Sequence, residues 1–269
     1  MSILKKILFK PFDNRVTQEI LEWNISTSLY LMGVGSGADV SVSGEKNVFN
    51  LVKKKLSAPY CFFDVGANKG QFLKLLLDSF RGYEFTVHSF EPGIETYQLL
   101  LKNHPNTQQV KFNNYGIGSE QGNATLYYDR PGSGAASLTK RRLDHFNVDF
   151  DKSEIVQIET INGYCLKNNI DHIHLLKIDI EGHELGALAG ASQLIENQAI
   201  DLITFEFGGC NIDTRSFLQD FWYFFMAAKM DVFRITPTGY LFQLKSYREI
   251  YEQFKTTNFV AVSQRLKKK

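Results

Sequence analysis

Ionisable side chains crowd the end of one apolar segment of the sequence. The stretch HLLKIDIEGHE at 174–184 begins as a strand-like run and then places Lys177, Asp179, Glu181 and His183 at every second position. Alternate side chains of an extended chain share a face, so Lys177, Asp179 and Glu181 are expected to point the same way. Buried charges need polar partners. We therefore expect these side chains to face a cleft that binds a polar ligand.

A glycine turn, DVGANKG at 64–70, is the second such feature. Ligands of open α/β sheets bind at the carboxyl ends of strands, and this turn directly follows an apolar run. A dinucleotide fingerprint would need glycines at 64, 66 and 69, where the chain has Asp64, Gly66 and Lys69. A phosphate loop would need Gly-Lys followed by serine or threonine, which NKGQ does not supply. The turn therefore disfavours both NAD and ATP.

The acid at the start of this turn favours a ligand with a positive group and no phosphate. S-adenosylmethionine is such a ligand, because it carries an ammonium, a carboxylate, a sulfonium and a ribose. Gly66 lets the backbone come close, and Glu91, which closes HSFEP, can accept both ribose hydroxyls. The alternative is that Asp64 caps the next helix and Glu91 ends an ordinary strand. The paired spacing of the two acids favours the cofactor.

Strand-like and helix-like runs alternate from residue 60 onward and position these motifs. The expected strands are 60–66, 84–92, 109–117, 173–179 and 201–207, and the expected helices are 70–80, 93–104, 181–197 and 214–229. This alternation predicts an α/β fold with a mostly parallel sheet and helices on both faces. An antiparallel pair at 230–237 and 256–264 is expected to finish the sheet. Residues 1–57 stand outside this rhythm as an extension with a candidate lid or substrate segment, and 58–269 form the main domain.

Composition limits the partners and the compartment. The 30 basic and 29 acidic residues give a net charge of +1 and no global field for phosphate backbones, so nucleic acid is not expected as a partner. Three cysteines stand far apart, which favours reduced thiols and a cytoplasmic location. No apolar run reaches the length that crosses a bilayer. Residues 1–12 are amphipathic and either pack on their own domain or rest weakly on a membrane surface. The oligomeric state is left open.

Four motifs carry a resemblance to a known family. CFFDVGANKGQF, HSFEP, KFNNYGIGS and LLKIDIEGHELGALAGA resemble, in this order, the motifs of the FkbM family of S-adenosylmethionine-dependent methyltransferases over about residues 60–210. The resemblance implies the class I methyltransferase fold, a Rossmann-like sheet that is mostly parallel with an antiparallel terminal strand. It implies that Asp64, Gly66, Asn68 and Glu91 line the cofactor pocket, with Asn114, Tyr115 and Gly116 near the adenine. Members are best known for O-methylating hydroxyls, commonly on sugars.

The substrate side departs from the family pattern at two places. The usual SSL is here Ala136, Ser137 and Leu138, and the usual Thr-Leu-Asp is Thr160, Ile161 and Asn162. The resemblance therefore supports the cofactor site more firmly than the acceptor site.

In this fold the charged strand end lies beside the glycine turn and takes part in methyl transfer. An in-line displacement needs an aligned acceptor whose proton is helped to leave, so Asp179 is the predicted base or orienting group and His183 the second candidate. Lys177 would neutralise the cluster or bind an acceptor carboxylate, and Glu181 would hold sugar hydroxyls. The alternatives are a simple Lys177–Asp179 ion pair, and stabilisation of Glu181 and Glu184 by a helix dipole.

Two further alternatives concern metal and turnover. We expect no metal, the alternative being Mg²⁺ held by Asp179 and Glu206 at the ends of adjacent strands. The predicted function is O-methylation of a hydroxyl of a saccharide or a glycan-related small molecule. The alternative is a protein that keeps the cofactor fold for binding or regulation without turnover.

Overall fold

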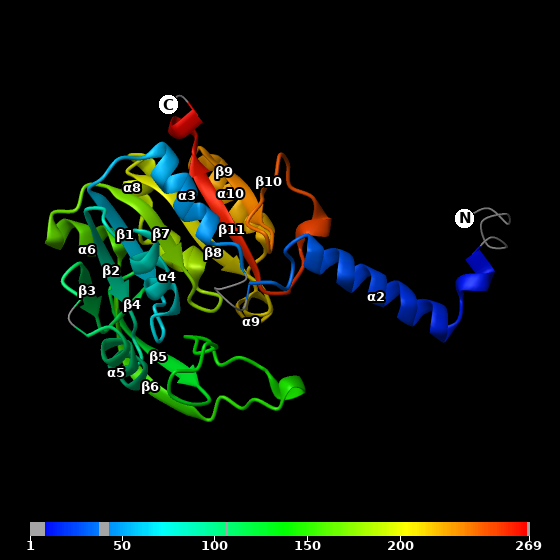
Figure 1. Ribbon diagram of the computed structural model, residues 1–269. Coiled ribbons are helices and arrows are strands. Elements are labelled where there is room, and N and C mark those ends of the chain that lie inside the picture. Colours follow the sequence, from blue (N-terminus) through cyan, green and yellow to red (C-terminus); the bar gives the residue numbers. More distant parts are fainter. Residues whose placement is uncertain (1–8, 38–42, 106, 268–269) are drawn as a thin grey trace.

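A mostly parallel eight-stranded sheet forms the centre of the molecule (Figure 1). The computed structural model describes residues 9–37, 43–105 and 107–267. Its strands are, in sheet order, β10 (Leu241–Gln243), β9 (Met230–Ile235), β11 (Thr257–Ser263), β8 (Ile200–Phe207), β7 (Ile173–Ile178), β1 (Tyr60–Val65), β2 (Phe85–Phe90) and β3 (Val110–Asn113). β11 runs antiparallel to both β8 and β9. The predicted class I methyltransferase fold and its antiparallel terminal pair are confirmed.

Helices cover both faces of this sheet. The helices after residue 45 are α3 (Lys46–Lys55), α4 (Gln71–Ser79), α5 (Ile94–Asn103), α6 (Ile161–Asn168), α7 (Glu184–Ala189), α8 (Ser192–Glu196), α9 (Cys210–Thr214) and α10 (Leu218–Ala227). Successive residues of β1 enter different cores, because strand side chains alternate between faces. Phe62 packs in a cluster with residues of α3, α4 and α5, whereas Phe63 packs with residues of α6, α7, α8 and α10. The near-continuous apolar sequence of the strand follows from this double burial.

A second, three-stranded sheet was not expected from the sequence. It contains β4 (Gly116–Ile117), β5 (Gly122–Tyr128) and β6 (Lys152–Glu159) in the order β4-β6-β5, around a small core of Leu126, Val156 and Ile158. The long connection at 129–151 joins β5 to β6 and contains the short 3₁₀ helix η2 (Asp144–Phe146). This sheet and its connection lie on the side of the main sheet where β1, β2 and β7 end (Figure 1).

One predicted helix is divided in the structure, and another begins later than predicted. The run at 181–197 forms α7 and α8, and the run at 214–229 forms α10, with only Thr214 in the preceding α9. Gly190, between α7 and α8, approaches the chain so closely that a Cβ atom there would lie 2.1 Å from the carbonyl oxygen of Gly118. Arg215, after α9, adopts a left-handed backbone conformation that ends the helix. Tertiary contacts and local geometry therefore interrupt an apolar period that looks continuous in the sequence.

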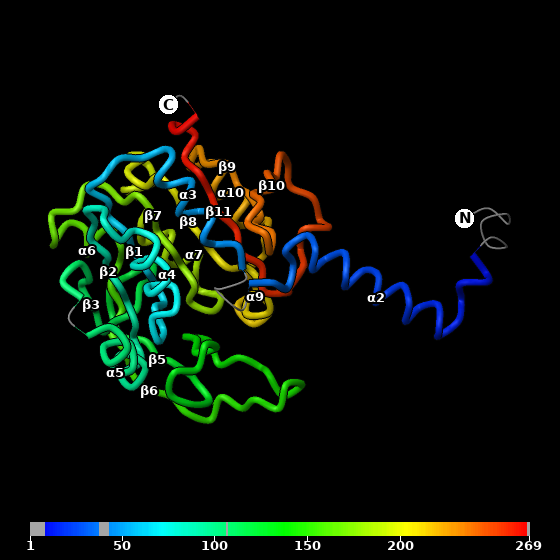
Figure 2. Tube along the Cα trace, in the orientation of Figure 1, coloured from blue at the N-terminus to red at the C-terminus, as the bar shows by residue number. Residues whose placement is uncertain are grey.

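The N-terminal region has two different parts. α2 (Arg15–Leu31), preceded by the 3₁₀ helix η1 (Lys10–Phe12), projects away from the body (Figures 1 and 2). α3, in contrast, buries Val48, Phe49 and Val52 in the core. The expected boundary at residue 57 stays a prediction. Most of the predicted membrane-contacting segment, residues 1–8, lies outside the described residues, as do residues 38–42 of the turn-rich stretch.

The described residues also include two 3₁₀ helices near the C-terminal end, η3 (Glu249–Tyr251) and η4 (Gln264–Lys267). Across the described ranges, no helix combines the length and the apolar composition needed to cross a membrane.

Candidate active site

Two adjoining cavities open at the carboxyl ends of β1, β2 and β7. The smaller offers about 680 Å³ of space, part of which is open to solvent, and is lined by the glycine turn after β1 and by β4. Gly66, Asn68, Glu91 and Gly116, four residues predicted for the cofactor, line it together. Further wall residues are Phe90, Ile117, Leu126 and Ile158, which are apolar, and Ser133, Gly134, Ala136, Ser137 and Leu138 of the long connection. An apolar pocket with a few convergent polar groups is the usual form of a cofactor site.

The glycine turn is shaped by its contact with the end of β7. Gly66 has a φ of 77°, and a Cβ atom at this position would lie 1.9 Å from the carbonyl oxygen of Asp179. The backbone N–H groups of Gly66 and Ala67 both donate to the carbonyl oxygen of Phe90, at 3.1 and 2.9 Å. Only glycine fits this close approach. The turn is thus fixed to both neighbouring strands before any ligand arrives.

Glu91 is held by two backbone amides at the edge of the smaller cavity. Its carboxylate accepts from the N–H of Asn68 and the N–H of Gly93, each at 3.0 Å. Burial raises the pKa of Glu91 to about 7, although both amide hydrogen bonds act to lower it. Each carboxylate oxygen has a second lone pair for a further donor. The geometry suits a carboxylate that receives ligand hydroxyls.

Asn68 adds an unsatisfied polar group to the same cavity. Its backbone takes a left-handed conformation, with φ of 48°, and its side-chain Oδ1 is buried with no hydrogen-bond partner among the described residues. A buried acceptor without a donor is costly, so its donor is expected from a ligand. Two groups therefore support the fit of a polar cofactor to this cavity: the Oδ1 atom of Asn68 and the carboxylate of Glu91.

Lys177 joins the glycine turn to the charged strand end. Its Nζ donates to the carbonyl oxygen of Gly66 at 2.7 Å and lies 3.4 Å from Asp64 Oδ1 and 3.5 Å from Asp179 Oδ2. Burial alone would lower the pKa of Lys177, but the carboxylates of Asp179, Asp64 and Glu45 outweigh it and raise the pKa. Lys177 therefore remains an ammonium ion, in the wall of the larger cavity.

Asp64 lies below the cavities rather than in their walls. Its side chain is completely buried, and burial raises its pKa while Lys177 opposes the rise. Of the described residues that line either cavity, Asp64 is not one, although Gly66 and Lys177 beside it are. The predicted contact of Asp64 with the cofactor stays a prediction. In the structure, Asp64 contacts Lys177, which itself lines the larger cavity.

The larger cavity is an open cleft with about 2300 Å³ of space. Asp179 and Glu181 line both cavities, together with Gly66 and Asn68. The side chain of Asp179 is 40% exposed, in contrast to Lys177 at 7%. The cleft thus adjoins the smaller cavity along a shared wall that includes Asp179.

Glu181 is fixed by an arginine that the sequence did not indicate. Arg141 donates to Glu181 Oε2 at 2.5 Å and lies 3.5 Å from Asp213. Burial and the nearby Asp179 raise the pKa of Glu181, and Arg141 counteracts them. Glu181 adopts a φ of 55° and precedes α7, so it is not in the first helical turn as the alternative interpretation required. The Arg141–Glu181 ion pair holds the long connection at 129–151 against the end of β7. A second contact comes from Ser137 Oγ, which donates to the carbonyl oxygen of Glu181 at 2.8 Å.

His183 and Glu184 follow with different surroundings. His183 lines the smaller cavity, its Nε2 lies 3.0 Å from Thr139 Oγ1, and burial lowers its pKa. Glu184 is fully buried and accepts from the N–H groups of Ile180 and Gly182, each at 3.1 Å. Burial raises the pKa of Glu184 to about 7. Its carboxylate therefore organises the turn that carries Glu181, in addition to its place at the start of α7.

Asn114 and Tyr115, both predicted to lie near the adenine, lie near the smaller cavity without lining it. Asn114 Nδ2 donates to the carbonyl oxygens of Glu91 and Pro92, both at 3.0 Å, and Tyr115 packs against the core ring of Phe90. Neither is among the described residues that line the two cavities, whereas Gly116 is. The sequence located the right segment, but the backbone of this segment directs these two side chains elsewhere.

Glu45 was also missed, since it stands in the N-terminal extension far from any motif. It is buried, accepts from Ser43 Oγ at 2.7 Å and lines the larger cleft with Glu206. Burial raises the pKa of Glu45 to about 7. Burial, followed by the charges of Asp179 and Glu181, also raises the pKa of Glu206. No sequence pattern links these positions, which only the fold brings together.

Among the described residues, two groups of side chains have spacing that suits metal ligands. Glu181, Glu206 and Cys210 place ligand atoms within 4.8 Å of one another beside the cleft. Asp179, predicted as the partner of Glu206 for Mg²⁺, lines the same cleft but is not in this group. The expectation of no metal and its Mg²⁺ alternative both stay predictions.

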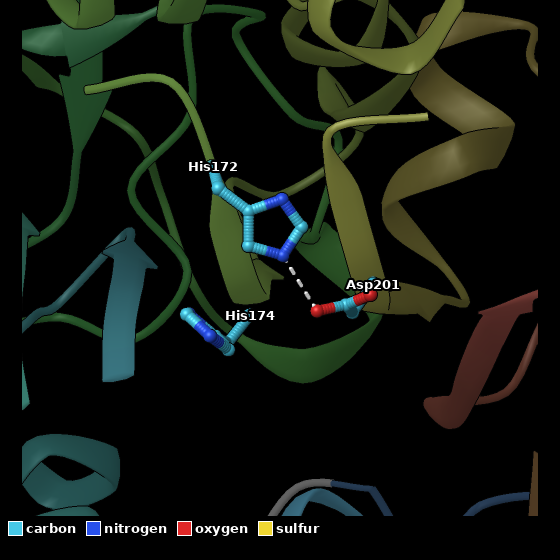
Figure 3. Close-up of side chains that lie close together, drawn as sticks. All are labelled: His172, His174 and Asp201. Atoms are coloured by element: carbon cyan, nitrogen blue, oxygen red, sulfur yellow. Dashed lines mark hydrogen bonds and ion pairs between the residues drawn. The ribbon is translucent and has the colours of Figure 1, made fainter. Parts of the chain in front are cut away.

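The second group, His172, His174 and Asp201, lies at the opposite end of the strands (Figure 3). Arg265 donates to Asp201 Oδ1 at 2.6 Å, and His172 Nε2 lies 2.7 Å from Asp201 Oδ2. His174 Nδ1 accepts from the backbone N–H of Cys61 at 3.0 Å, so its other ring nitrogen carries the proton when the ring is neutral. A protonated nitrogen is no ligand, and this cluster is best explained as an internal ion-pair network.

The segment that carries these motifs matches a family of known proteins. A family model described as the methyltransferase FkbM domain matches residues 64–233. The crystal structure of methyltransferase FkbM from Methylobacillus flagellatus KT has 14% identity and a TM-score of 0.44, covering 84% of this chain and 60% of that chain. The O-methyltransferase from Bacillus cereus in complex with SAH has 11% identity and a TM-score of 0.42, covering 97% and 98%.

A putative rRNA methylase from Clostridium thermocellum has 9% identity and a TM-score of 0.41, covering 80% of this chain and 95% of that chain. The chain thus spans less than two thirds of the Methylobacillus structure and nearly all of the other two. No curated protein sequence matches the chain.

Proposed function

We propose, on the premise that the chain belongs to the FkbM methyltransferase family, that it transfers a methyl group from S-adenosylmethionine to a hydroxyl of a saccharide or a glycan-related small molecule. One observation carries the proposal. Asp179 lies in the wall that the small cavity of the glycine turn shares with the large open cleft. A group in this shared wall can contact a donor on one side and an acceptor on the other.

The smaller cavity suits S-adenosylmethionine, which supplies a methyl group on a sulfonium when it is bound. Glu91 would accept the ribose hydroxyls, and the buried Oδ1 of Asn68 would receive a donor that it lacks in the protein alone. Gly66 allows close backbone approach, and the apolar side chains of Ile117 and Leu126 offer surface for an adenine ring. Gly116 lies among these residues, as the family resemblance implies.

Asp179 would orient the acceptor hydroxyl and take up its proton. A positioned base of this kind typically contributes about 10²- to 10⁴-fold in rate. Lys177 would hold the Asp179 carboxylate in place through their 3.5 Å ion pair, and its second contact with Gly66 keeps both parts of the site in register. His183 is the second candidate base, because burial favours its neutral form and its ring lines the same cavity.

The larger cleft suits a hydroxyl-rich acceptor better than a nucleic acid. Carboxylates accept hydrogen bonds from hydroxyls and repel phosphates. Six acidic residues line the cleft, Glu45, Asp78, Asp129, Asp179, Glu181 and Glu206, against Lys74, Arg130 and Lys177. Of these three bases, Lys177 is already paired with carboxylates. Glu181, held by Arg141, would bind acceptor hydroxyls.

We further propose a cytoplasmic location. Cys61, Cys165 and Cys210 are free, which supports the expected reducing cytoplasmic setting.

The proposal is tested by methyl transfer from labelled S-adenosylmethionine to a panel of nucleotide sugars, oligosaccharides and RNA. We expect label in at least one saccharide, resistant to the mild base that cleaves methyl esters. Asp179→Asn should abolish transfer, whereas Asp171→Asn, an exposed aspartate before the opposite end of β7, should leave it unchanged. Label in RNA alone would contradict the saccharide acceptor. Cofactor binding without transfer to any acceptor would favour the regulatory alternative.

A further inference from the structure

α2 is a helix of 17 residues without a buried residue. It projects from the body as an arm (Figures 1 and 2). Large apolar side chains are nevertheless exposed along it, including Val16 at 65%, Trp23 at 67% and Leu31 at 70%. Most helical stability in proteins comes from packing of an apolar face, so a helix with this composition needs a partner. The described part of the chain does not supply one.

The apolar residues follow a spacing that fits helix pairing. Val16, Ile20, Trp23, Thr27 and Tyr30 are separated by four, three, four and three residues. This alternation places them on one stripe of the helix, as in the seam of two packed helices. The polar residues Arg15, Glu19, Glu22 and Ser26 lie along one flank of this stripe by the same helical geometry, whereas Leu21 and Ile25 lie on the far side and are also exposed. The arm therefore has an apolar seam with one polar flank.

The base of the arm is anchored on the body. The N–H groups of Gly35 and Gly37 donate to the carbonyl oxygen of Thr256, at 3.0 and 3.1 Å. Gly33 turns with a φ of 95° so close to the end of β9 that a Cβ atom would lie 2.3 Å from the carbonyl oxygen of Ile235. The direction of α2 is thus set by a tight glycine turn against the sheet. This turn presents the seam outward instead of returning it to the body.

The charges of α2 distinguish between a protein partner and a lipid surface. Arg15 pairs with Glu19 at 2.7 Å, which leaves Glu22 as the remaining charge of the helix. Helices that bind anionic membranes carry lysine and arginine on their polar face, and an acidic α2 is opposed by such lipids. Pairing between two copies of the chain does not require complementary charges from a different molecule, because each copy presents the same apolar seam.

The seam is large enough for a symmetric pair. Covering its exposed aromatic and aliphatic side chains would remove on the order of 500 Å² per copy, or about 1,000 Å² in total, which is the lower range of specific interfaces. We infer that α2 packs against α2 of a second copy of this chain, so that the protein forms a dimer through its N-terminal arms. Ile20 and Trp23 lie at the centre of this interface.

Sedimentation velocity of the full chain tests the inference over roughly 1 to 100 µM, the range in which such an interface would dissociate. We expect a species of twice the chain's 30.7 kDa at high concentration. Ile20→Ser with Trp23→Ser should remain monomeric, and Glu22→Gln with Ser26→Ala, on the polar flank, should dimerise like the wild type. Because α2 buries nothing in the body, the melting temperature of the first variant should be that of the wild-type monomer.

A second measurement uses the two tryptophans of the chain. In a Trp222→Phe variant, Trp23 is the only tryptophan, and its emission should move to shorter wavelength with rising protein concentration. A wild type that stays monomeric, or a dimer that survives Ile20→Ser with Trp23→Ser, overturns the inference. Monomeric wild type that sediments with phosphatidylcholine or phosphatidylglycerol vesicles would assign the seam to a membrane instead.

Discussion

Gly66 and Asp179 are in direct contact, although 113 positions separate them: the carbonyl oxygen of Asp179 occupies the space that a Cβ atom at position 66 would need, at 1.9 Å. The turn after β1 and the end of β7 therefore form one unit. Any change that separates them would disturb the cofactor cavity and the proposed base together.

Gly66→Ala should consequently damage the site far more than its backbone conformation alone would require. Gly82 is a matched control, because its φ of 87° is similar but an added Cβ would meet nothing within 4 Å. We expect Gly82→Ala to cost about 1 kcal/mol from its left-handed backbone and to leave S-adenosylhomocysteine binding intact. Gly66→Ala should lose binding by calorimetry. Equal behaviour of the two variants would show that the contact is unimportant.

Lys177 should owe much of its stabilising effect to Asp64, the buried carboxylate 3.4 Å away. Removal of one partner of a buried ion pair leaves an uncompensated charge, so Lys177→Met should lower the free energy of unfolding by about 3 to 5 kcal/mol. The Asp64→Asn, Lys177→Met double variant should be more stable than the sum of the two single changes by about 1 to 3 kcal/mol. Urea unfolding of all four proteins measures this coupling. Strict additivity would contradict the ion pair.

Glu184 gives a prediction about pH. Burial raises its pKa from 4.5 to about 7, so the folded state holds this proton more tightly than the unfolded state between these values. The contribution of the protonated Glu184 side chain to the stability of the folded state is complete below pH 4.5 and declines as the pH rises to about 7. Glu184→Gln does not titrate and keeps an oxygen for the N–H groups of Ile180 and Gly182, so its stability relative to wild type should rise over that window by up to about 3 kcal/mol.

Thermal and urea unfolding between pH 4 and 8 measure the difference. Glu184→Ala should be less stable than Glu184→Gln at every pH, because it also leaves those two amides without their acceptor. If the difference in stability between Glu184→Gln and the wild type does not change with pH, the Glu184 carboxyl does not titrate between pH 4.5 and 7.

The sequence predicts the main sheet well, since its strands are long apolar runs that end in recognisable turns. The residues at these ends, Gly66, Asn68, Glu91 and Asp179, could be placed together because carboxyl ends of parallel strands meet at one edge. The small sheet was missed because β5 and β6 are joined by the long connection at 129–151, and a hairpin is recognised in a sequence only when a short turn joins its two strands.

The remaining contacts of the site depend on long-range packing that no local pattern encodes. Arg141 reaches Glu181 from a loop 40 positions earlier, and Glu45 enters the cleft from the N-terminal region. Tyr115 lies in a recognised motif, yet its ring enters the core beside Phe90 because the backbone at β4 turns it there. Motifs locate segments, and only tertiary structure fixes which side chain of a segment faces the ligand.

The most direct test is calorimetric binding of S-adenosylhomocysteine to the wild type, Glu91→Ala and Asp179→Asn, with and without EDTA. Loss of the buried carboxylate should weaken binding about 10- to 100-fold in Glu91→Ala, in keeping with hydrogen bonds to a charged group. Asp179→Asn should bind like the wild type and fail to transfer methyl groups, and EDTA should change neither affinity. A well-folded wild type that does not bind, or Glu91→Ala that binds unchanged, would contradict the assignment of the smaller cavity to the cofactor.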